Sequence, residues 1–314
     1  MIPLSDIRAA AGRIAPHVHR TPIFSSAQIG DRAGVRLSLK CESFQKTGSF
    51  KARGALNKIL SLSAEERGKG LVTVSAGNHA AAVAWAARIA GAAAVVVMPT
   101  GAPASKIEAV RGYGAEVILH EDRSTLFDRL NEVKEARGLT FVHPFDDPVV
   151  LAGAGTVGLE IAEDLPDLDA VIVAVGGGGL LGGVASAVKQ LRPSARVVAV
   201  ELEAGPGLGP ALAAGKPVPV KRPADTLADG MTPPFVGVLP LSIVREAVDE
   251  IVTVTEDEIV EGMRLLLTRA KLYVEGSGAA AVAALLAGKV RFAAGTRVVA
   301  IVSGGNIDLA RLPR

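Results

Sequence analysis

Short, uninterrupted apolar segments alternate with helix-like segments along most of the 314-residue sequence, and this alternation strongly limits the folds that the chain can adopt. Continuous apolar runs are typical of strands buried on both faces, and the intervening segments are typical of the helices that cover them. The pattern predicts an α/β fold with parallel sheets. The expected strands cover residues 35–40, 71–74, 93–98, 116–120, 140–142, 170–175, 196–200 and 297–302, and the expected helices cover residues 78–89, 105–113, 124–137, 156–164, 180–191, 257–271 and 277–286.

Charge and cysteine content exclude several classes of protein. The 34 basic and 32 acidic residues nearly balance, which gives no support to nucleic-acid binding. Cys41 is the single cysteine, so the chain has no intrachain disulfide. We expect its side chain to be buried and to pack as a small apolar residue. A single cysteine also fits a cytoplasmic protein. The most membrane-like stretch, 80–98, contains Arg88 and Gly91, so we interpret it as a helix followed by a strand and expect no membrane segment.

Four consecutive glycines, Gly176, Gly177, Gly178 and Gly179, follow the predicted strand 170–175. A glycine-rich turn between a strand and a helix can bind a phosphate through backbone N–H groups and the helix dipole. A dinucleotide is one candidate, since Gly177, Gly179 and Gly182 have GxGxxG spacing and Glu201 follows in the position of a ribose-binding acid. Another phosphate is the second candidate. Tight helix–sheet packing alone ranks last. The Gly- and Pro-rich stretch 205–234 predicts an irregular excursion near this site.

Lys51 lies just inside a predicted helix start, after Gly48 and Ser49. The positive end of a helix disfavours an ammonium group and lowers its pKa, which an amine that forms a Schiff base requires. The position alone is weak support, because most lysines are solvated, as we expect for Lys46 and Lys58.

A second polar turn, Ser75-Ala76-Gly77-Asn78-His79, lies between a predicted strand and a predicted helix. Its N–H groups and short side chains suit a carboxylate or a phosphate, and the alternative interpretation is an ordinary N-cap by Asn78 or Ser75. We assign no catalytic role to the ring of His79, because the sequence offers it no apparent carboxylate partner.

Five motifs in this order resemble the serine/threonine dehydratase family of pyridoxal-phosphate enzymes, which have the tryptophan-synthase β fold. The superfamily includes serine racemase and the cysteine synthases. The resemblance implies a two-domain parallel-sheet fold with a large cofactor-binding domain, residues 1–69 and 147–314, and a small mobile domain, residues 70–146. It also implies a homodimer. The motifs are KTGSFKARGA at 46–55, SAGNH at 75–79, HPFDDP at 143–148, GGGGL at 176–180 and SGGNID at 303–308.

The same resemblance implies roles for individual residues. Lys51 would hold the cofactor covalently and act as the base, Phe50 would pack beside the cofactor ring, and Ser303 would face the pyridine nitrogen. Asn78 would hydrogen-bond the ring hydroxyl. The phosphate would be bound by Gly176, Gly177, Gly178 and Gly179, and the substrate carboxylate by Ser75, Ala76, Gly77, Asn78 and His79. The resemblance also implies a mono- or divalent cation near Glu201. The carboxylate ligands of a divalent cation would be incomplete, because Glu203 is followed by Ala-Gly-Pro-Gly-Leu-Gly.

The implied reaction is β-elimination of water from L-threonine or L-serine, which yields a 2-oxo acid and ammonia. A serine at 303 cannot hold a protonated pyridine as an aspartate could, which favours prompt elimination. Ala76 occupies the place of the second serine of related racemases, so serine racemase activity is disfavoured. Dehydratases of 3-hydroxyaspartate or phenylserine remain alternatives. Arg53 or Arg123 could pair with an acidic substrate, although surface or structural roles are more common for both.

Two other classes remain open at this point. One is an NAD-dependent oxidoreductase built on Gly177–Gly182 and Glu201, which leaves Lys51 and the 303–306 turn without a role. The other is a ligand-binding regulator that keeps the cofactor fold without turnover, and the intact Lys51 argues against it.

Overall fold

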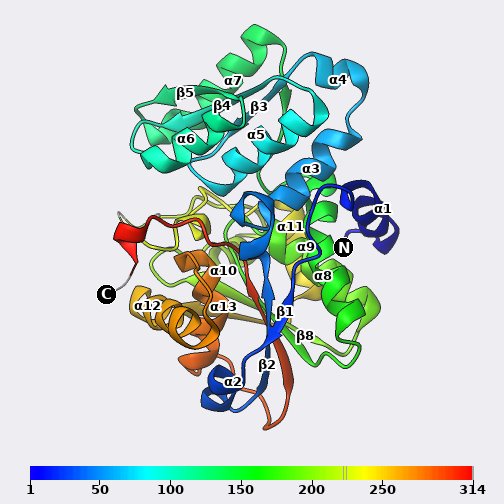
Figure 1. The fold of residues 1–314 in the computed structure, drawn as a ribbon, viewed down its shortest axis with the longest axis vertical. Helices are drawn as coiled ribbons and strands as arrows, with labels where there is room; N and C mark the ends of the chain where they lie inside the picture. The colour runs from blue at the N-terminus through cyan, green and yellow to red at the C-terminus, as the bar shows by residue number, and fades with distance from the viewer. Residues whose placement is uncertain (222, 224, 313–314) are drawn as a thin grey trace.

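A computed structural model gives the fold and describes residues 1–221, 223 and 225–312. It contains two mixed layers of helix and sheet, with the smaller sheet at the top of Figure 1 and the larger one below it. The predicted α/β class with parallel sheets is confirmed. The strands are β1 (Ile23–Ser25), β2 (Arg36–Cys41), β3 (Leu71–Val74), β4 (Ala94–Pro99), β5 (Glu116–His120), β6 (Thr140–Phe141), β7 (Ala170–Ala174), β8 (Arg196–Leu202), β9 (Glu250–Val254) and β10 (Arg297–Val302).

Thirteen α-helices surround these strands in the described part of the chain. They are α1 (Leu4–Ile14), α2 (Ala27–Ala33), α3 (Lys51–Ser61), α4 (Ala64–Gly68), α5 (Asn78–Ala90), α6 (Ala104–Gly112), α7 (Leu126–Arg137), α8 (Pro148–Asp164), α9 (Gly179–Leu191), α10 (Leu208–Ala214), α11 (Val238–Ala247), α12 (Glu256–Leu265) and α13 (Gly276–Leu286). None of the helices among the described residues is long and apolar enough to cross a membrane.

The larger sheet has the strand order β1-β2-β10-β7-β8-β9. Only the edge strand β1 is antiparallel to its neighbour, and the other five strands are parallel. Both faces are covered, as the continuous apolar strands require. In β7, Ile172 packs into a core with α2, α12 and α13, whereas Val171 and Val173 pack into a second core with α1, α8, α9 and α11.

The smaller sheet has the order β5-β4-β3-β6, and all of its pairs are parallel. Residues of α3, α5 and α6 cover one face and α7 covers the other. Its strands fall between Leu71 and Phe141, inside the predicted small domain 70–146, whose mobility stays a prediction. Helix α3 lies between the two layers in Figure 1. It packs against the smaller sheet on one side and against α8 of the larger layer on the other, where Gly54 and Gly153 allow close contact.

The eight predicted strands are present as β2–β8 and β10, with ends that match the prediction or differ from it by at most two residues. The expectation that a helix begins at Thr156 is wrong: α8 begins at Pro148, because Asp147 accepts hydrogen bonds from the N–H groups of Val149 and Val150 and caps it. The stretch 205–234 is not wholly irregular, since it contains α10 and a short 3-10 helix, Asp229–Met231.

Candidate active site

Four predicted site segments meet at the carboxyl ends of β7 and β10, next to the start of α5 of the smaller layer. Ligand sites of parallel sheets commonly lie at this edge. The N–H of Phe50 donates to the carbonyl oxygen of Ser303 at 3.1 Å, so the start of α3 lies against the end of β10. Asn78 hydrogen-bonds Asn306 of the turn that follows β10. The structure therefore brings together Lys51, Asn78, Ser303 and the glycine turn.

Lys51 is the first residue of α3, as predicted. Its Nζ donates a hydrogen bond to the carbonyl oxygen of Pro144 at 2.7 Å and lies 5.2 Å from the ring centroid of Phe50. Although part of the residue remains accessible, burial of the amine lowers its pKa to about 8, because desolvation penalises the charged form. An amine with this pKa exchanges protons readily near neutral pH.

The four-glycine turn is packed more closely than the sequence analysis assumed. A Cβ on Gly177 would overlap the Phe145 ring, one on Gly176 would lie 2.6 Å from the Gly230 carbonyl oxygen, and one on Gly178 would lie 2.5 Å from Pro240. Gly178 also has a left-handed φ of 91°. Packing, which the sequence analysis ranked last, is thus sufficient to require glycine here. The turn still places N–H groups at the start of α9, where an anion is favoured.

Asn78, the first residue of α5, is held on both sides of its amide. Its Nδ2 donates to Glu275 Oε1 at 2.7 Å, and its Oδ1 accepts from Asn306 Nδ2 at 2.8 Å. These two contacts fix the orientation of the amide and leave the second N–H of Nδ2 for a ligand. They also join the smaller layer to the larger one at the site.

Glu275 is a buried carboxyl group that the sequence analysis missed. It is 2% exposed, and burial, with a contribution from Asp229, raises its pKa to about 8. Nothing in the local sequence marks it, because it lies in an unremarkable segment before the small-residue helix α13. Asn306 was detectable, since it lies in the quoted 303–308 motif.

Several buried polar atoms around the site have no hydrogen-bond partner among the described residues: Ser49 Oγ, Ser277 Oγ, Glu275 Oε2 and His79 Nδ1. Ser303, buried at the end of β10, donates to the Ser277 carbonyl oxygen at a long 3.2 Å. Buried polar groups are normally paired, so unpaired groups gathered in one place are typical of a site that binds a polar ligand.

The 75–79 turn lies at the start of α5. The Gly77 N–H donates to Ser75 Oγ at 3.2 Å, and the Cβ position of Gly77 lies 3.2 Å from Lys106 Nζ. His79 is buried, its Nε2 lies 3.2 Å from the Val142 carbonyl oxygen, and burial together with Lys51 lowers its pKa well below the usual range. The ring is therefore neutral at physiological pH. Ala76 is partly buried and offers no proton.

Glu201, the predicted cation ligand, accepts hydrogen bonds from backbone groups. Its Oε1 accepts hydrogen bonds from the N–H groups of Gly207 and Leu208 at 2.7 and 2.8 Å, so it caps the start of α10. Within the described ranges, no three His, Cys, Asp or Glu side chains are grouped to hold a metal ion. The cation stays a prediction.

The structure also places three other residues that were singled out from the sequence. Arg123 is exposed in a 3-10 turn, and Cys41 is fully buried. The expectation that Lys58 is solvated is wrong, because Lys58 forms an ion pair with Asp147.

The chain is similar to several known proteins over nearly all of its length. The chain is 46% identical over 318 residues to an L-threonine ammonia-lyase of Thermotoga maritima, covering all of this chain and 78% of that one. It is 45% identical to a catabolic L-threonine dehydratase of Escherichia coli, over 99% and 95% of the two chains. The structure of maize serine racemase superposes with a TM-score of 0.93 at 41% identity, covering 98% and 95%. The model of the family described as "Pyridoxal-phosphate dependent enzyme" matches residues 14–304, and the chain belongs to this family.

Proposed function

We propose that the protein is a pyridoxal-phosphate-dependent ammonia-lyase that acts on L-threonine and L-serine. The hydroxyl group leaves Cβ as water after the Cα proton is removed, and hydrolysis of the released enamine consumes water and gives a 2-oxo acid and ammonia. The observation that carries this proposal is the desolvated Lys51 amine, with its pKa of about 8, at the edge of the sheet where unpaired polar groups gather. Two of the similar proteins named above carry the corresponding activity in their names.

The residues present fit the cofactor. Lys51 supplies the amine, and the start of α9 supplies N–H groups for a phosphate. The buried hydroxyl groups of Ser49 and Ser277 lack partners among the described residues, and a polar ligand would satisfy them. Ser303 provides a neutral hydroxyl at the end of β10, and Asn78 has an N–H to spare.

When bound, the cofactor supplies a conjugated electron sink for the charge that develops at Cα. The protein's own contribution begins with Lys51, whose lowered pKa leaves a useful fraction of neutral amine to accept the Cα proton at Nζ. We assign Phe50 to one side of the ring and Ser303 to the pyridine nitrogen. The Ser303 hydroxyl group carries no charge, so it would support the electron-withdrawing role of the cofactor less strongly than a carboxylate would.

We assign substrate binding to the 75–79 turn. The unpaired N–H groups at the start of α5, together with the Ser75 hydroxyl group, suit the α-carboxylate of an amino acid. His79 contributes as a neutral residue, because its ring is buried and its pKa is far below its usual value. The Lys106–Asp229 ion pair, at 2.5 Å, lies beside Gly77.

Serine racemase activity is the second candidate, supported by the likeness to the maize enzyme. Racemisation requires a proton donor on the second face of Cα. Ala76 lies where the resemblance places that donor, and its methyl group has no proton to give. We therefore expect elimination to dominate. We also propose, from the family resemblance, that the protein is a cytoplasmic homodimer, and sedimentation analysis would test the number of subunits.

One experiment tests the proposal. The purified protein loaded with pyridoxal phosphate is incubated with L-threonine, L-serine, 3-hydroxyaspartate and phenylserine, and 2-oxo acid and ammonia are measured together. Borohydride treatment followed by peptide mass spectrometry identifies the modified lysine. We expect modification at Lys51 and most product from threonine or serine. Modification at another lysine would contradict the proposal, and loss of L-serine without formation of 2-oxo acid or ammonia would favour the racemase.

A further inference from the structure

A second group of buried charges lies outside the proposed site, on the other side of the start of α3. It contains two cations and two anions, so its formal charges balance. We call it the Arg53 cluster, and it consists of Arg53, Glu42, Glu160, Lys40, Thr21 and Thr156. Arg53, Lys40 and Glu42 are completely buried, and Glu160 is 8% exposed.

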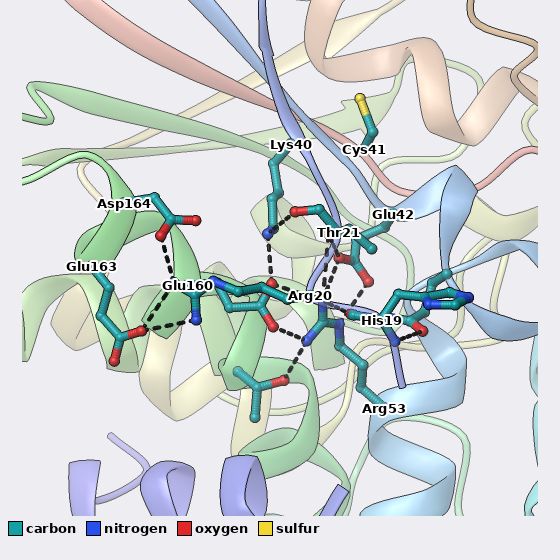
Figure 2. Close-up of polar contacts among 12 residues, drawn as sticks. His19, Arg20, Thr21, Lys40, Cys41, Glu42, Arg53, Glu160, Glu163 and Asp164 are labelled. Carbon is teal, nitrogen blue, oxygen red and sulfur yellow. Dashed lines mark hydrogen bonds and ion pairs between the residues drawn. The ribbon is translucent and has the colours of Figure 1, made fainter. Parts of the chain in front are cut away.

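Arg53 is the centre of this cluster, as Figure 2 shows. Its guanidinium binds each glutamate in a bidentate manner. Nε and Nη2 donate to Glu42 at 2.8 Å each, and Nη1 and Nη2 donate to Glu160 at 2.6 and 2.9 Å. Nη1 also donates to Thr156 Oγ1 at 3.1 Å, and Nη2 donates to the His19 carbonyl oxygen at 3.2 Å. Burial alone would lower the pKa of Arg53, but Glu42 and Glu160 outweigh it and raise the pKa, so the group stays charged.

The partners of Arg53 come from separate elements of the larger layer. Glu42 directly follows β2, and Glu160 and Thr156 lie on α8. Lys40 of β2 completes the cluster, donating to Glu160 at 2.6 Å and to the Thr21 carbonyl oxygen at 2.8 Å. The neighbouring Cys41 points away from the cluster in Figure 2, as expected for adjacent residues of a strand. One side chain therefore links the first turn of α3 to both a strand end and a long helix.

Lys51 and Arg53 are two residues apart in the first turn of α3. Successive residues of an α-helix are separated by about 100°, so these side chains leave the helix about 200° apart, on nearly opposite faces. A rotation of the turn that moves Arg53 would move Lys51 with it. The contacts on the Lys51 side, Phe50 N–H to Ser303 O and the bridge between Ser49 and Gly304, hold the chain ahead of the helix.

Stability by itself does not account for such a cluster. Buried ion pairs often contribute little net stability relative to apolar residues of the same volume, whereas they specify one geometry strictly. A guanidinium with two bidentate carboxylates specifies both a position and a plane. We propose that Arg53 is a positioning residue, which fixes the rotation of the first turn of α3 and thereby directs the Lys51 amine into the site.

This inference rests on the proposed role of Lys51 as the cofactor lysine. Its test uses three variants of the full chain. Arg53→Lys keeps the charge but cannot bind two carboxylates in a bidentate manner. Arg53→Met/Glu42→Gln removes one ion pair in a charge-balanced way and releases α3. The matched control, Lys189→Met/Asp249→Asn, removes one balanced, partly buried ion pair elsewhere in the larger layer and leaves both carboxylates of Arg53 in place.

The readout is the covalent bond itself. Each protein is titrated with pyridoxal phosphate and reduced with borohydride, and the modified fraction of Lys51 is measured by peptide mass spectrometry. We expect half-maximal modification to require about 10- to 100-fold more cofactor in Arg53→Met/Glu42→Gln, a smaller shift in the same direction in Arg53→Lys, and a shift within about two-fold in the control. Urea unfolding of the two double variants checks that their stabilities are comparable.

Three outcomes separate the hypotheses. Equal modification in the wild type and in both Arg53 variants would overturn the positioning role. Equal loss in the control would also overturn it, because the loss would then follow from removing any partly buried ion pair. No modification of Lys51 in the wild-type protein would instead contradict the proposed function. If the double variant fails to fold, Arg53→Lys still decides the question, since it leaves the charge of the cluster unchanged.

Discussion

The molecule contains two buried polar regions on opposite sides of the start of α3, and they differ in how completely their groups are paired. In the Arg53 cluster, each charged side chain has a partner of opposite charge within 2.8 Å. In the second region, which we call the Glu275 group (Glu275, Asn78, Ser277, Ser303 and Asn306), Glu275 Oε2 and Ser277 Oγ have no partner among the described residues.

The pKa values reflect this difference. Arg53 is as buried as Glu275, yet its pKa is raised by its carboxylates and it stays charged. Burial moves the pKa values of Glu275 and Lys51 in opposite directions toward about 8. Near pH 7 the Glu275 carboxyl group is therefore mostly uncharged, whereas the Lys51 amine is mostly charged with a useful fraction in its neutral form. Burial thus leaves Arg53 permanently charged, because carboxylate partners surround it. It leaves Glu275 and Lys51 able to exchange protons, because neither has an ion-pair partner of opposite charge among the described residues.

Removal of the Lys51 amine is expected to have the largest effect. Lys51→Ala should lower the rate of 2-oxo acid formation by about 1,000-fold or more, because the variant loses both the base and the covalent anchor. The rate is measured with saturating cofactor. Lys69→Ala is the control, since Lys69 forms an exposed ion pair with Glu65 and should be silent. Residual activity within ten-fold of the wild type would remove Lys51 from the mechanism.

Breaking the paired region should cost stability. Arg53→Met leaves Glu42 and Glu160 buried with only Lys40 to balance them, and the free energy of unfolding should fall by about 3–5 kcal/mol. Urea unfolding followed by circular dichroism measures the loss. Arg123→Met, at an exposed position, is the control and should change stability by less than about 0.5 kcal/mol. A loss of similar size in both variants would contradict the assigned structural role of Arg53.

Glu275→Gln sharpens the comparison through pH. The folded pKa of Glu275, about 8, is above its usual value, so the folded protein binds more protons than the unfolded chain between about pH 4.5 and 8. This contribution to stability is fully present below pH 4.5 and is lost as the pH rises through 8. Lys51 changes in a separate window, because its folded pKa of about 8 lies below the usual 10.5 and its cost disappears only above pH 8.

Glu275→Gln cannot lose a proton at this position, so its stability should not decline as the pH rises from 5 to 8. The free energy of unfolding of the variant should therefore rise relative to that of the wild type by a few kcal/mol over this range. Urea midpoints at several pH values measure the slope. Glu121→Gln, at an exposed position, should keep the wild-type slope. Parallel curves for wild type and Glu275→Gln would show that the buried carboxyl group does not titrate as described.

The smallest effect compares one buried hydroxyl group from each region. Ser277 Oγ has no partner among the described residues, so Ser277→Ala should change the free energy of unfolding by no more than about 0.5 kcal/mol or increase it. Thr156 Oγ1 accepts from Arg53 and donates to the Gly153 carbonyl oxygen, so Thr156→Val should cost about 1–3 kcal/mol. Equal costs would show that the two regions do not differ in pairing.

Local sequence was sufficient for a large part of this protein. The apolar runs predicted eight of the ten strands found among the described residues, because burial on both faces of a parallel sheet leaves a pattern that neighbouring residues carry by themselves. The local sequence also placed Lys51 at a helix start and the four-glycine turn directly after β7. The missed strands, β1 and β9, lie at the edges of the larger sheet, where burial is incomplete and the pattern is weak.

Only the tertiary structure decided the environment of the charges. Arg53 has the same local sequence whether it lies on the surface or in a core, and its partner Glu160 is 107 residues away. Glu275 meets Asn78 across 197 residues. Burial and pairing depend on which distant segments are brought together, and these two quantities set the pKa values. The sequence thus determined the sheets and the position of the amine, whereas the packing of remote elements determined which groups stay charged.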